Sequence, residues 1–129
     1  MGKKIIVIDD EIAIQRSFEL ALEDSGYGVD TASSGREGLE MLENGSYDLV
    51  FLDLKMPEMT GVETLRQIRK RDENIPVYIV TAFYGEFFDE LSAMAEGGTD
   101  FEVLNKPVDG DTILKVCQGV LEGVMILDD

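Results

Sequence analysis

The sequence predicts an α/β domain of three layers, with a doubly wound, five-stranded parallel sheet between two layers of helices. Two observations predict this fold. Five short apolar segments rich in β-branched residues recur along the 129-residue chain, and segments with helical spacing separate them. Strands that alternate with helices pair in parallel through right-handed crossovers. We therefore expect a β-α unit repeated five times within one domain.

The expected strands are short, and three of them are nearly continuous apolar stretches. Strands that helices cover on both faces have this composition. Glycines mark many of the joints between elements. In chain order the expected strands are residues 4–8 (KIIVI), 28–32 (GVDTA), 47–52 (YDLVFL), 77–80 (VYIV) and 101–104 (FEVL).

Apolar residues at helical spacing mark the segments that follow the strands. The fourth helix, at about residues 86–96, has the weakest pattern. The apolar faces of the other helices contain Ile14, Phe18, Ala21 and Leu22 in the first, Leu39 and Leu42 in the second, Val62, Leu65 and Ile68 in the third, and Ile113, Val116, Cys117, Val120, Leu121 and Val124 in the last. Because Cys117 belongs to an apolar face, we expect a buried structural thiol.

Composition excludes several classes of function. The chain has 11 Lys+Arg against 27 Asp+Glu, a formal charge of −16, which argues against direct nucleic-acid binding. No apolar run exceeds four residues, so we expect no membrane-spanning segment. The chain has no histidine and a single cysteine, which removes histidine-assisted nucleophiles, histidine metal sites and an internal disulfide. Its chemistry must therefore depend on carboxylates, hydroxyls and lysine.

Polar residues follow four of the five expected strands. Because the carboxyl ends of parallel strands meet at one edge of the sheet, these side chains should converge there. Each has an ordinary structural interpretation when taken alone, such as a helix N-terminus, a turn or a solvated loop. Their combination indicates a site. The residues are Asp9, Asp10 and Glu11 after the first strand, Asp53 after the third, Thr81 after the fourth, and Lys106 after the fifth.

Three converging carboxylates favour a divalent cation. Without one they would repel each other and raise the pKa of at least one carboxyl group. Ligation by oxygen alone fits Mg²⁺ better than zinc, and Mg²⁺ beside a lysine and a hydroxyl can hold a phosphoryl group. Asp53 is the best candidate to accept the phosphoryl group, because it is the single carboxylate at its strand end, while Asp9 and Asp10 form a metal-binding pair.

These motifs together resemble the receiver domain of two-component response regulators. The resemblance covers the motifs IVIDDE at residues 6–11, LDLKMP at 52–57, Gly61, Thr81-Ala82 and Lys106-Pro107. It implies a flavodoxin-like sheet with strand order 2-1-3-4-5. We expect one receiver domain over residues 1–129, without an output domain. This organisation, together with Lys55 and the run TAFYGE at residues 81–86, is most similar to single-domain members of the sporulation-phosphorelay type. The acidic, partly apolar end at residues 124–129 slightly favours a complete chain.

The resemblance also implies a role for each motif residue. Asp53 would be the phosphoacceptor, Asp10 would bind Mg²⁺ (or Mn²⁺) directly, and Asp9 would act mainly through water. The backbone carbonyl of Lys55 would be a further metal ligand. The phosphoryl group would be held by the side chains of Thr81 and Lys106 and by the backbone N–H groups of Leu54 and Ala82.

The implied function is that of a cytoplasmic signalling switch rather than an enzyme, although the domain would promote its own phosphorylation and autodephosphorylation. The donor would be a phosphohistidine on a sensor histidine kinase or a histidine phosphotransfer protein, since this chain has no histidine. The output would be altered binding of a downstream protein target. We expect a monomer, with dimerisation on phosphorylation as the alternative, and no contact with nucleic acid or membrane.

The sequence departs from the family pattern in two places. Val103 occupies the usual position of the switch aromatic, three residues before the lysine, so switching has either moved to Phe101 or been lost. The interval between Thr81 and Lys106 is longer than usual, and its aromatics either fill the core under the fourth helix, in two cases, or form a partner-binding surface. These aromatics are Phe83, Tyr84, Phe87 and Phe88.

Other functions are less well supported. A phosphorylation-independent receiver-like interaction module is the main alternative. The five residues expected to form the phosphorylation pocket are, however, all present: Asp9, Asp10, Asp53, Thr81 and Lys106. A hydrolase of the haloacid-dehalogenase type would need a second aspartate where Lys55 stands. A flavodoxin-like electron carrier would need a phosphate-binding loop of Ser, Thr and Gly where Asp9, Asp10 and Glu11 follow the first strand.

Overall fold

The structure, a computed structural model, describes residues 2–123 and contains five strands and five α-helices in alternation, as predicted. A short 3₁₀ helix, η1, precedes the fourth α-helix. In chain order the elements are β1 (Lys4–Ile8), α1 (Ile12–Leu22), β2 (Gly28–Ala32), α2 (Gly35–Asn44), β3 (Leu49–Leu52), α3 (Gly61–Arg71), β4 (Val77–Thr81), η1 (Tyr84–Phe87), α4 (Phe88–Glu96), β5 (Glu102–Asn105) and α5 (Gly110–Glu122).

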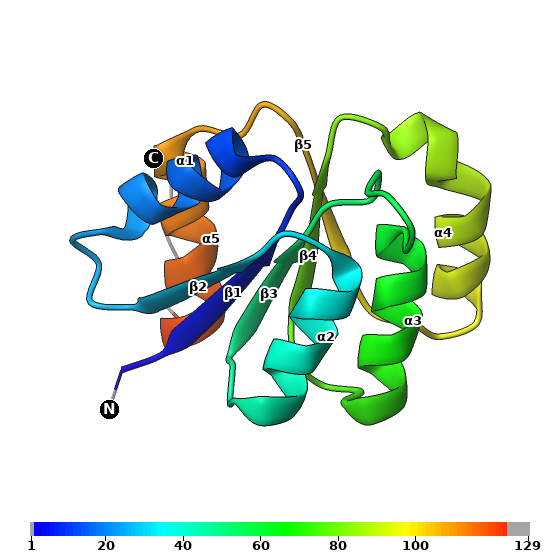
Figure 1. Cartoon of the computed structure of the whole chain (residues 1–129), viewed down its shortest axis with the longest axis horizontal. Helices are drawn as coiled ribbons and strands as arrows, with labels where there is room; N and C mark the ends of the chain where they lie inside the picture. The colour runs from blue at the N-terminus through cyan, green and yellow to red at the C-terminus, as the bar shows by residue number, and fades with distance from the viewer. Residues whose placement is uncertain (1, 124–129) are drawn as a thin grey trace.

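All five strands are parallel, in the order β2-β1-β3-β4-β5. Helices α1 and α5 cover one face of the sheet, and α2, α3 and α4 cover the other (Figure 1). The order reverses beside β1, whose neighbours are β2 and β3. In such a sheet, ligands bind outside the carboxyl ends of the strands at this reversal. The predicted fold class and strand order are therefore confirmed.

The central strands alternate their side chains between two cores. Ile5 and Val7 of β1 pack with Phe18 of α1 and Cys117 of α5, whereas Ile6 and Ile8 pack with residues of α2, α3 and α4. This alternation follows from the two-residue period of a strand. Each fully buried Ile or Leu side chain stabilises the fold by about 2 kcal/mol. β1 and β3 therefore provide a rigid base for the loops that follow them.

Cys117 is fully buried, as expected from its place on the apolar face of α5. Desolvation raises the pKa of its thiol to about 12. Val124, assigned to the same face from the sequence, and the rest of residues 124–129 lie outside the described residues. Within residues 2–123, no helix is long and apolar enough to cross a membrane.

β1 and β2 have the predicted bounds, and the other three strands differ from the prediction by one or two residues. β3 begins at Leu49, two residues later than predicted, and the two preceding residues make side-chain hydrogen bonds. The Tyr47 hydroxyl donates to Asp30, and Asp48 accepts from the backbone N–H of Lys4. β5 lies one residue further along than predicted and ends at Asn105, opposite Thr81.

The start of the fourth helix differs from the starts of α2 and α3. α2 and α3 begin with hydroxyl caps, Ser34 and Thr60, which accept a backbone N–H three residues on. α4 instead follows directly from the 3₁₀ turn and has no side-chain cap. It therefore begins at Phe88, two residues later than predicted.

Candidate functional site

Three carboxylates converge at the carboxyl edge of the sheet. Asp9 and Asp10 follow β1 and Asp53 follows β3, and each offers a carboxylate oxygen within 4.8 Å of the others. Asp9 and Asp53 are buried, while Asp10 is exposed. We call these three residues the acidic group. The structure thus brings together the carboxylates that the strand ends predicted would meet.

Extensions of the sheet hydrogen bonding hold the two buried members in place. The Asp53 N–H donates to the Ile8 carbonyl at 2.9 Å, and the Asp9 N–H donates to the Ala32 carbonyl at 3.0 Å. The Glu11 N–H then donates to the Asp9 carboxylate at 2.9 Å. The backbone therefore fixes both carboxylates relative to the central strands.

Lys106 supplies the cation of the site. Its Nζ lies 2.9 Å from Asp9 Oδ2, 3.5 Å from Glu11 Oε1 and 3.6 Å from Asp53 Oδ1, and its side chain is only 11% exposed. The Lys106 N–H donates to the Thr81 carbonyl at 2.9 Å, which ties the loop after β5 to the end of β4. The ammonium thus reaches the acidic group, as predicted, with Glu11 as an additional partner.

Burial and mutual repulsion shift the titration of the buried carboxyl groups. Desolvation, and then the charge of Asp9, raise the pKa of Asp53 to about 6, against the opposing effect of Lys106. Desolvation also raises the pKa of Asp9, although its hydrogen bond to Lys106 acts in the other direction. For Lys106, desolvation is outweighed by the hydrogen bond to Asp9 and by the neighbouring carboxylates, so its pKa is raised. The predicted perturbation of at least one carboxyl pKa is therefore present.

The donor set fits a hard divalent cation. Asp53 Oδ1 is buried without a hydrogen-bond partner, and its 3.6 Å separation from Lys106 Nζ is too long for a hydrogen bond. This buried carboxylate oxygen therefore lacks a partner at hydrogen-bond distance, although it lies beside two further carboxylates. Mg²⁺ prefers such oxygen ligands, usually one or two carboxylates with water completing the shell.

The loop after β3 shapes the floor of the site. Leu54 is buried, Lys55 is exposed, and the Gly61 N–H closes the loop by donating to the Leu54 carbonyl at 2.8 Å. A Cβ atom at position 61 would collide with the Asp53 carbonyl. A residue with a side chain therefore cannot occupy this position unless the loop after β3 moves. The glycine noted in the sequence is thus required by close packing.

Thr81 and the residues after it border the site from β4. Thr81 is fully buried, and its Oγ1 accepts the Phe83 N–H at 3.0 Å, while Ala82 is exposed. Lys55 reaches this loop from β3: its Nζ lies 4.5 Å from the centre of the Phe83 ring and 3.3 Å from Glu86. The loops after β3 and β4 are therefore linked through a lysine.

The four aromatics of the long interval divide into two pairs. Phe87 is buried and Tyr84 packs partly against the core, whereas Phe83 and Phe88 are 40% and 48% exposed. Tyr84 and Phe88 meet edge to face at 5.6 Å. Two aromatics therefore contribute to the core and two remain available at the surface. The core interpretation thus applies to Tyr84 and Phe87, and the surface interpretation remains open for Phe83 and Phe88.

Phe101 and Val103, the alternative switch positions, both pack partly against the core formed with α2, α3 and α4. The two residues are two positions apart in an extended segment, so their side chains lie on the same side of the sheet. Phe101 precedes β5, however, and Asn105 is the residue of that strand that pairs with Thr81. Transmission from Thr81 to Phe101 stays a prediction.

Sequence reasoning missed two residues that support the acidic group. Gln15 of α1 is 8% exposed, and its Nε2 donates to the Asp9 carbonyl at 2.8 Å and to Ser33 Oγ at 3.1 Å. The available signal was a polar residue at helical spacing from the buried Phe18 and Leu22. Ser33 lies in a loop without charged residues, which gave no signal of a site.

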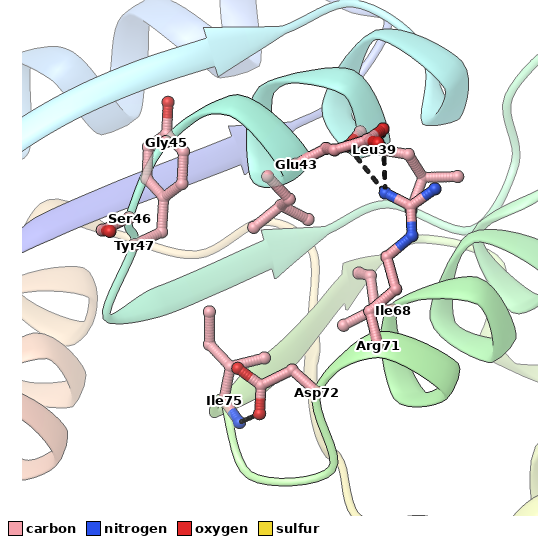
Figure 2. A pocket seen from close by; sticks show the side chains of 10 residues that line it. Leu39, Glu43, Gly45, Ser46, Tyr47, Ile68, Arg71, Asp72 and Ile75 are labelled. Carbon is pink, nitrogen blue, oxygen red and sulfur yellow. Dashed lines mark hydrogen bonds and ion pairs between the residues drawn. The ribbon is translucent and has the colours of Figure 1, made fainter.

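A separate hollow of about 350 Å³ lies between the ends of α2 and α3 (Figure 2). Leu39 and Ile68 line it, and the Arg71 guanidinium at its rim donates to the Leu39 carbonyl at 3.2 Å and lies 3.6 Å from Glu43. It contains no member of the acidic group. We therefore assign the chemistry to the carboxyl edge of the sheet and not to this hollow.

Fold and site together define a class: a doubly wound α/β domain with an oxygen-ligand site and a lysine at the strand reversal. The family model described as "Response regulator receiver domain" matches residues 5–118. The chain belongs to this family and is a receiver domain of two-component response regulators. Receiver domains of this family are phosphoacceptors.

Relatives and solved structures agree with this membership. The chain is 37% identical over 118 residues to the transcriptional regulatory protein GlrR of Escherichia coli, covering 92% of this chain and 26% of GlrR. It is 38% identical over 107 residues to the alkaline phosphatase synthesis transcriptional regulatory protein PhoP of Bacillus subtilis, covering 83% of this chain and 43% of PhoP. The chain thus spans less than half of the length of each of these relatives.

Solved receiver domains match over nearly their whole length. A CheY-like receiver domain protein from Methanospirillum hungatei superimposes with a TM-score of 0.85 at 29% identity, covering 95% of this chain and 96% of that one. A receiver domain protein from Clostridium thermocellum has a TM-score of 0.79 at 37% identity, covering 94% and 95%.

Proposed function

We propose that this domain accepts a phosphoryl group on Asp53, in a reaction that depends on Mg²⁺ (or Mn²⁺), and that the modification changes its binding to a downstream protein. The donor would be a phosphohistidine of a sensor histidine kinase or a histidine phosphotransfer protein in the cytoplasm. The observation that carries the proposal is the buried, unpartnered Oδ1 of Asp53 beside two carboxylates and 3.6 Å from the Lys106 ammonium.

The cation would be held by Asp9, Asp10 and Asp53, with the Lys55 carbonyl as a further ligand. When bound, it supplies positive charge that stabilises the phosphoryl oxygens during transfer. The raised pKa of Asp53, about 6, still leaves this carboxylate mostly ionised at pH 7. Asp53 can therefore act as the nucleophile without a separate base.

In the transfer step, an Asp53 oxygen forms a bond to phosphorus while the bond between phosphorus and the donor imidazole nitrogen breaks. The imidazole keeps the electron pair of the broken bond. Lys106 is placed to move from the Asp9 carboxylate to the incoming phosphoryl oxygens, because its Nζ already lies between Asp9 and Asp53. The N–H groups of Leu54 and Ala82 would bind the remaining oxygens.

The added charge would be transmitted through Thr81. Its Oγ1 accepts the Phe83 N–H, so a rotation of Thr81 toward the phosphoryl group would release that N–H and change the loop before α4. This loop carries Phe83, and Tyr84 contacts the exposed Phe88 of α4. We assign the partner-binding surface to the two exposed aromatics, Phe83 and Phe88.

The main alternative, a phosphorylation-independent interaction module, is not favoured, because such a module has no need for a buried lysine shared between buried carboxylates. GlrR and PhoP are named as transcriptional regulators, and the chain covers 26% and 43% of them. For this domain we propose protein partners alone, with a charge of −16 that favours partners with basic docking surfaces.

The proposal is tested by intact mass after incubation with acetyl phosphate, with and without Mg²⁺. The wild type should gain one phosphoryl group only when Mg²⁺ is present, and Asp53→Asn should gain none. Asp24→Asn, an exposed aspartate away from the acidic group, is the matched control and should behave as the wild type does. A wild type that neither gains mass nor binds Mg²⁺ would support the interaction module instead.

A further inference from the structure

Gln15 is a buried amide in a part of the molecule where apolar side chains predominate. It lies on the face of α1 that packs on the sheet, in line with Phe18 and Leu22. A buried amide must find hydrogen-bond partners to offset its desolvation. Gln15 finds two, one on each of the loops that follow β1 and β2: the Asp9 carbonyl and the Ser33 hydroxyl.

The partners define the orientation of the amide. The Asp9 carbonyl can only accept a hydrogen bond, so the nitrogen end of the Gln15 side chain must face it. The two N–H groups of Nε2 are then divided between the Asp9 carbonyl at 2.8 Å and Ser33 Oγ at 3.1 Å. Gln15 acts here as a double donor.

The Asp9 carbonyl belongs to the peptide that joins Asp9 to Asp10. Its plane decides the direction in which the Asp10 side chain leaves the backbone. The Asp9 N–H is already fixed to Ala32, and the Glu11 N–H to the Asp9 carboxylate. Asp10 itself is exposed, so its aim depends on this backbone. The Gln15 bond is the contact that holds the carbonyl of the intervening peptide.

Ser33, the second acceptor, is itself held firmly. Its N–H donates to Glu37 Oε1 at 2.5 Å, and the Glu37 N–H donates to Ser34 Oγ at 3.0 Å. These reciprocal bonds form a capping arrangement at the start of α2. Gln15 therefore links the acidic loop to a fixed helix terminus and not to a free side chain.

From these contacts we propose that Gln15 is a positioning residue, which fixes the Asp9–Asp10 peptide so that the Asp10 carboxylate points at the divalent cation. Gln15 does not touch the cation or the phosphoryl group. The inference rests on the proposed function, because the cation that it serves is the Mg²⁺ of phosphoryl transfer. Residues that orient metal ligands in this way typically change metal affinity by about tenfold or more when they are replaced.

The decisive variant is Gln15→Met, which keeps the length and packing of the side chain but removes both N–H donors. Gln118→Met on α5 is the matched control, because Gln118 lines the groove between α1 and α5 and is remote from the acidic group. Mg²⁺ affinity is measured by isothermal titration calorimetry, and Tm is measured by circular dichroism in EDTA.

Gln15→Met should bind Mg²⁺ about tenfold more weakly than the wild type, with little change in Tm, while Gln118→Met should match the wild type. Phosphorylation from acetyl phosphate should then need more Mg²⁺ to reach half its maximal rate, and saturating Mg²⁺ should restore that maximal rate. If Gln15→Met does not fold, Gln15→Asn, which keeps an amide but shortens the side chain by the methylene needed to reach the Asp9 carbonyl, is judged by the same criterion.

An unchanged Mg²⁺ affinity in Gln15→Met would overturn the inference, and so would a loss of Tm in EDTA without a loss of affinity, which would make Gln15 merely structural. A maximal rate that stays low at saturating Mg²⁺ would also contradict a role exerted through the metal. If the wild type itself bound no Mg²⁺, the proposed function would fail first. The two failures are therefore distinguishable.

Discussion

Replacement of Asp53 by asparagine should stabilise the metal-free domain at neutral pH. Asp53 is 3% exposed, and desolvation and the charge of Asp9 raise its pKa from 3.8 to about 6. A change of this size corresponds to about 3 kcal/mol of unfolding free energy lost above pH 6. The asparagine amide also needs hydrogen bonds when buried, so we expect a net gain of about 2 kcal/mol, or about 5–10 °C in Tm.

The gain should depend on pH with a definite sign. A carboxyl group with a raised pKa holds its proton more tightly in the folded state, so between pH 3.8 and about 6 the native protein binds more protons than the unfolded chain. The stability of the wild type should therefore fall as pH rises through this window. The advantage of Asp53→Asn should be largest above pH 6 and should disappear toward pH 4.

Urea unfolding in EDTA at a series of pH values from 4 to 8 measures both effects, with Asp24→Asn as the exposed control. The control should stay within about 0.5 kcal/mol of the wild type at every pH. If Asp53→Asn were no more stable than the wild type at pH 7, or if its advantage persisted at pH 4, the proposed electrostatic cost at Asp53 would be refuted.

Three further substitutions probe the same site. Asp10→Ala should weaken Mg²⁺ binding about tenfold or more by calorimetry, yet stabilise the metal-free protein, because Asp10 contributes to the raised pKa of Asp53; equal affinity would contradict the metal assignment. Lys106→Met should lower stability in EDTA by about 3 kcal/mol, since it leaves Asp9 and Asp53 without their cation, and Mg²⁺ should recover part of the loss in thermal melts; no recovery would contradict the shared role. Phe83→Ala should shorten the phosphoryl half-life, because the ring and Lys55 would then obstruct attacking water less; an unchanged half-life would remove this idea.

The sheet and the acidic group were predictable because they depend on strong, local signals. β1 and β3 are continuous apolar runs, and a residue that follows a parallel strand must lie at its carboxyl edge. This rule alone places Asp9 and Asp53 together. Lys106 follows by the same rule from β5, where the N–H of the lysine continues the ladder to Thr81.

Features that depend on tertiary contacts were not predictable in this way. The choice between core and surface for Phe87 and Phe88 is set by the 3₁₀ turn, which no capping residue announces. Gln15 acquires its role only when α1 packs against the loops after β1 and β2, which places Ser33 within its reach. A polar residue on a buried helical face was the single hint in the sequence.

The central claim is that Asp53, and no other carboxylate, forms the bond to phosphorus. The most direct measurement is to phosphorylate the wild type with acetyl phosphate and Mg²⁺, reduce the acyl phosphate with borohydride, and locate the product by tandem mass spectrometry of peptides. Reduction of an aspartyl phosphate leaves homoserine, so homoserine should be found at position 53 and at no other aspartate. Homoserine at position 9 or 10, or none in a protein that carries a phosphoryl group, would contradict the assignment.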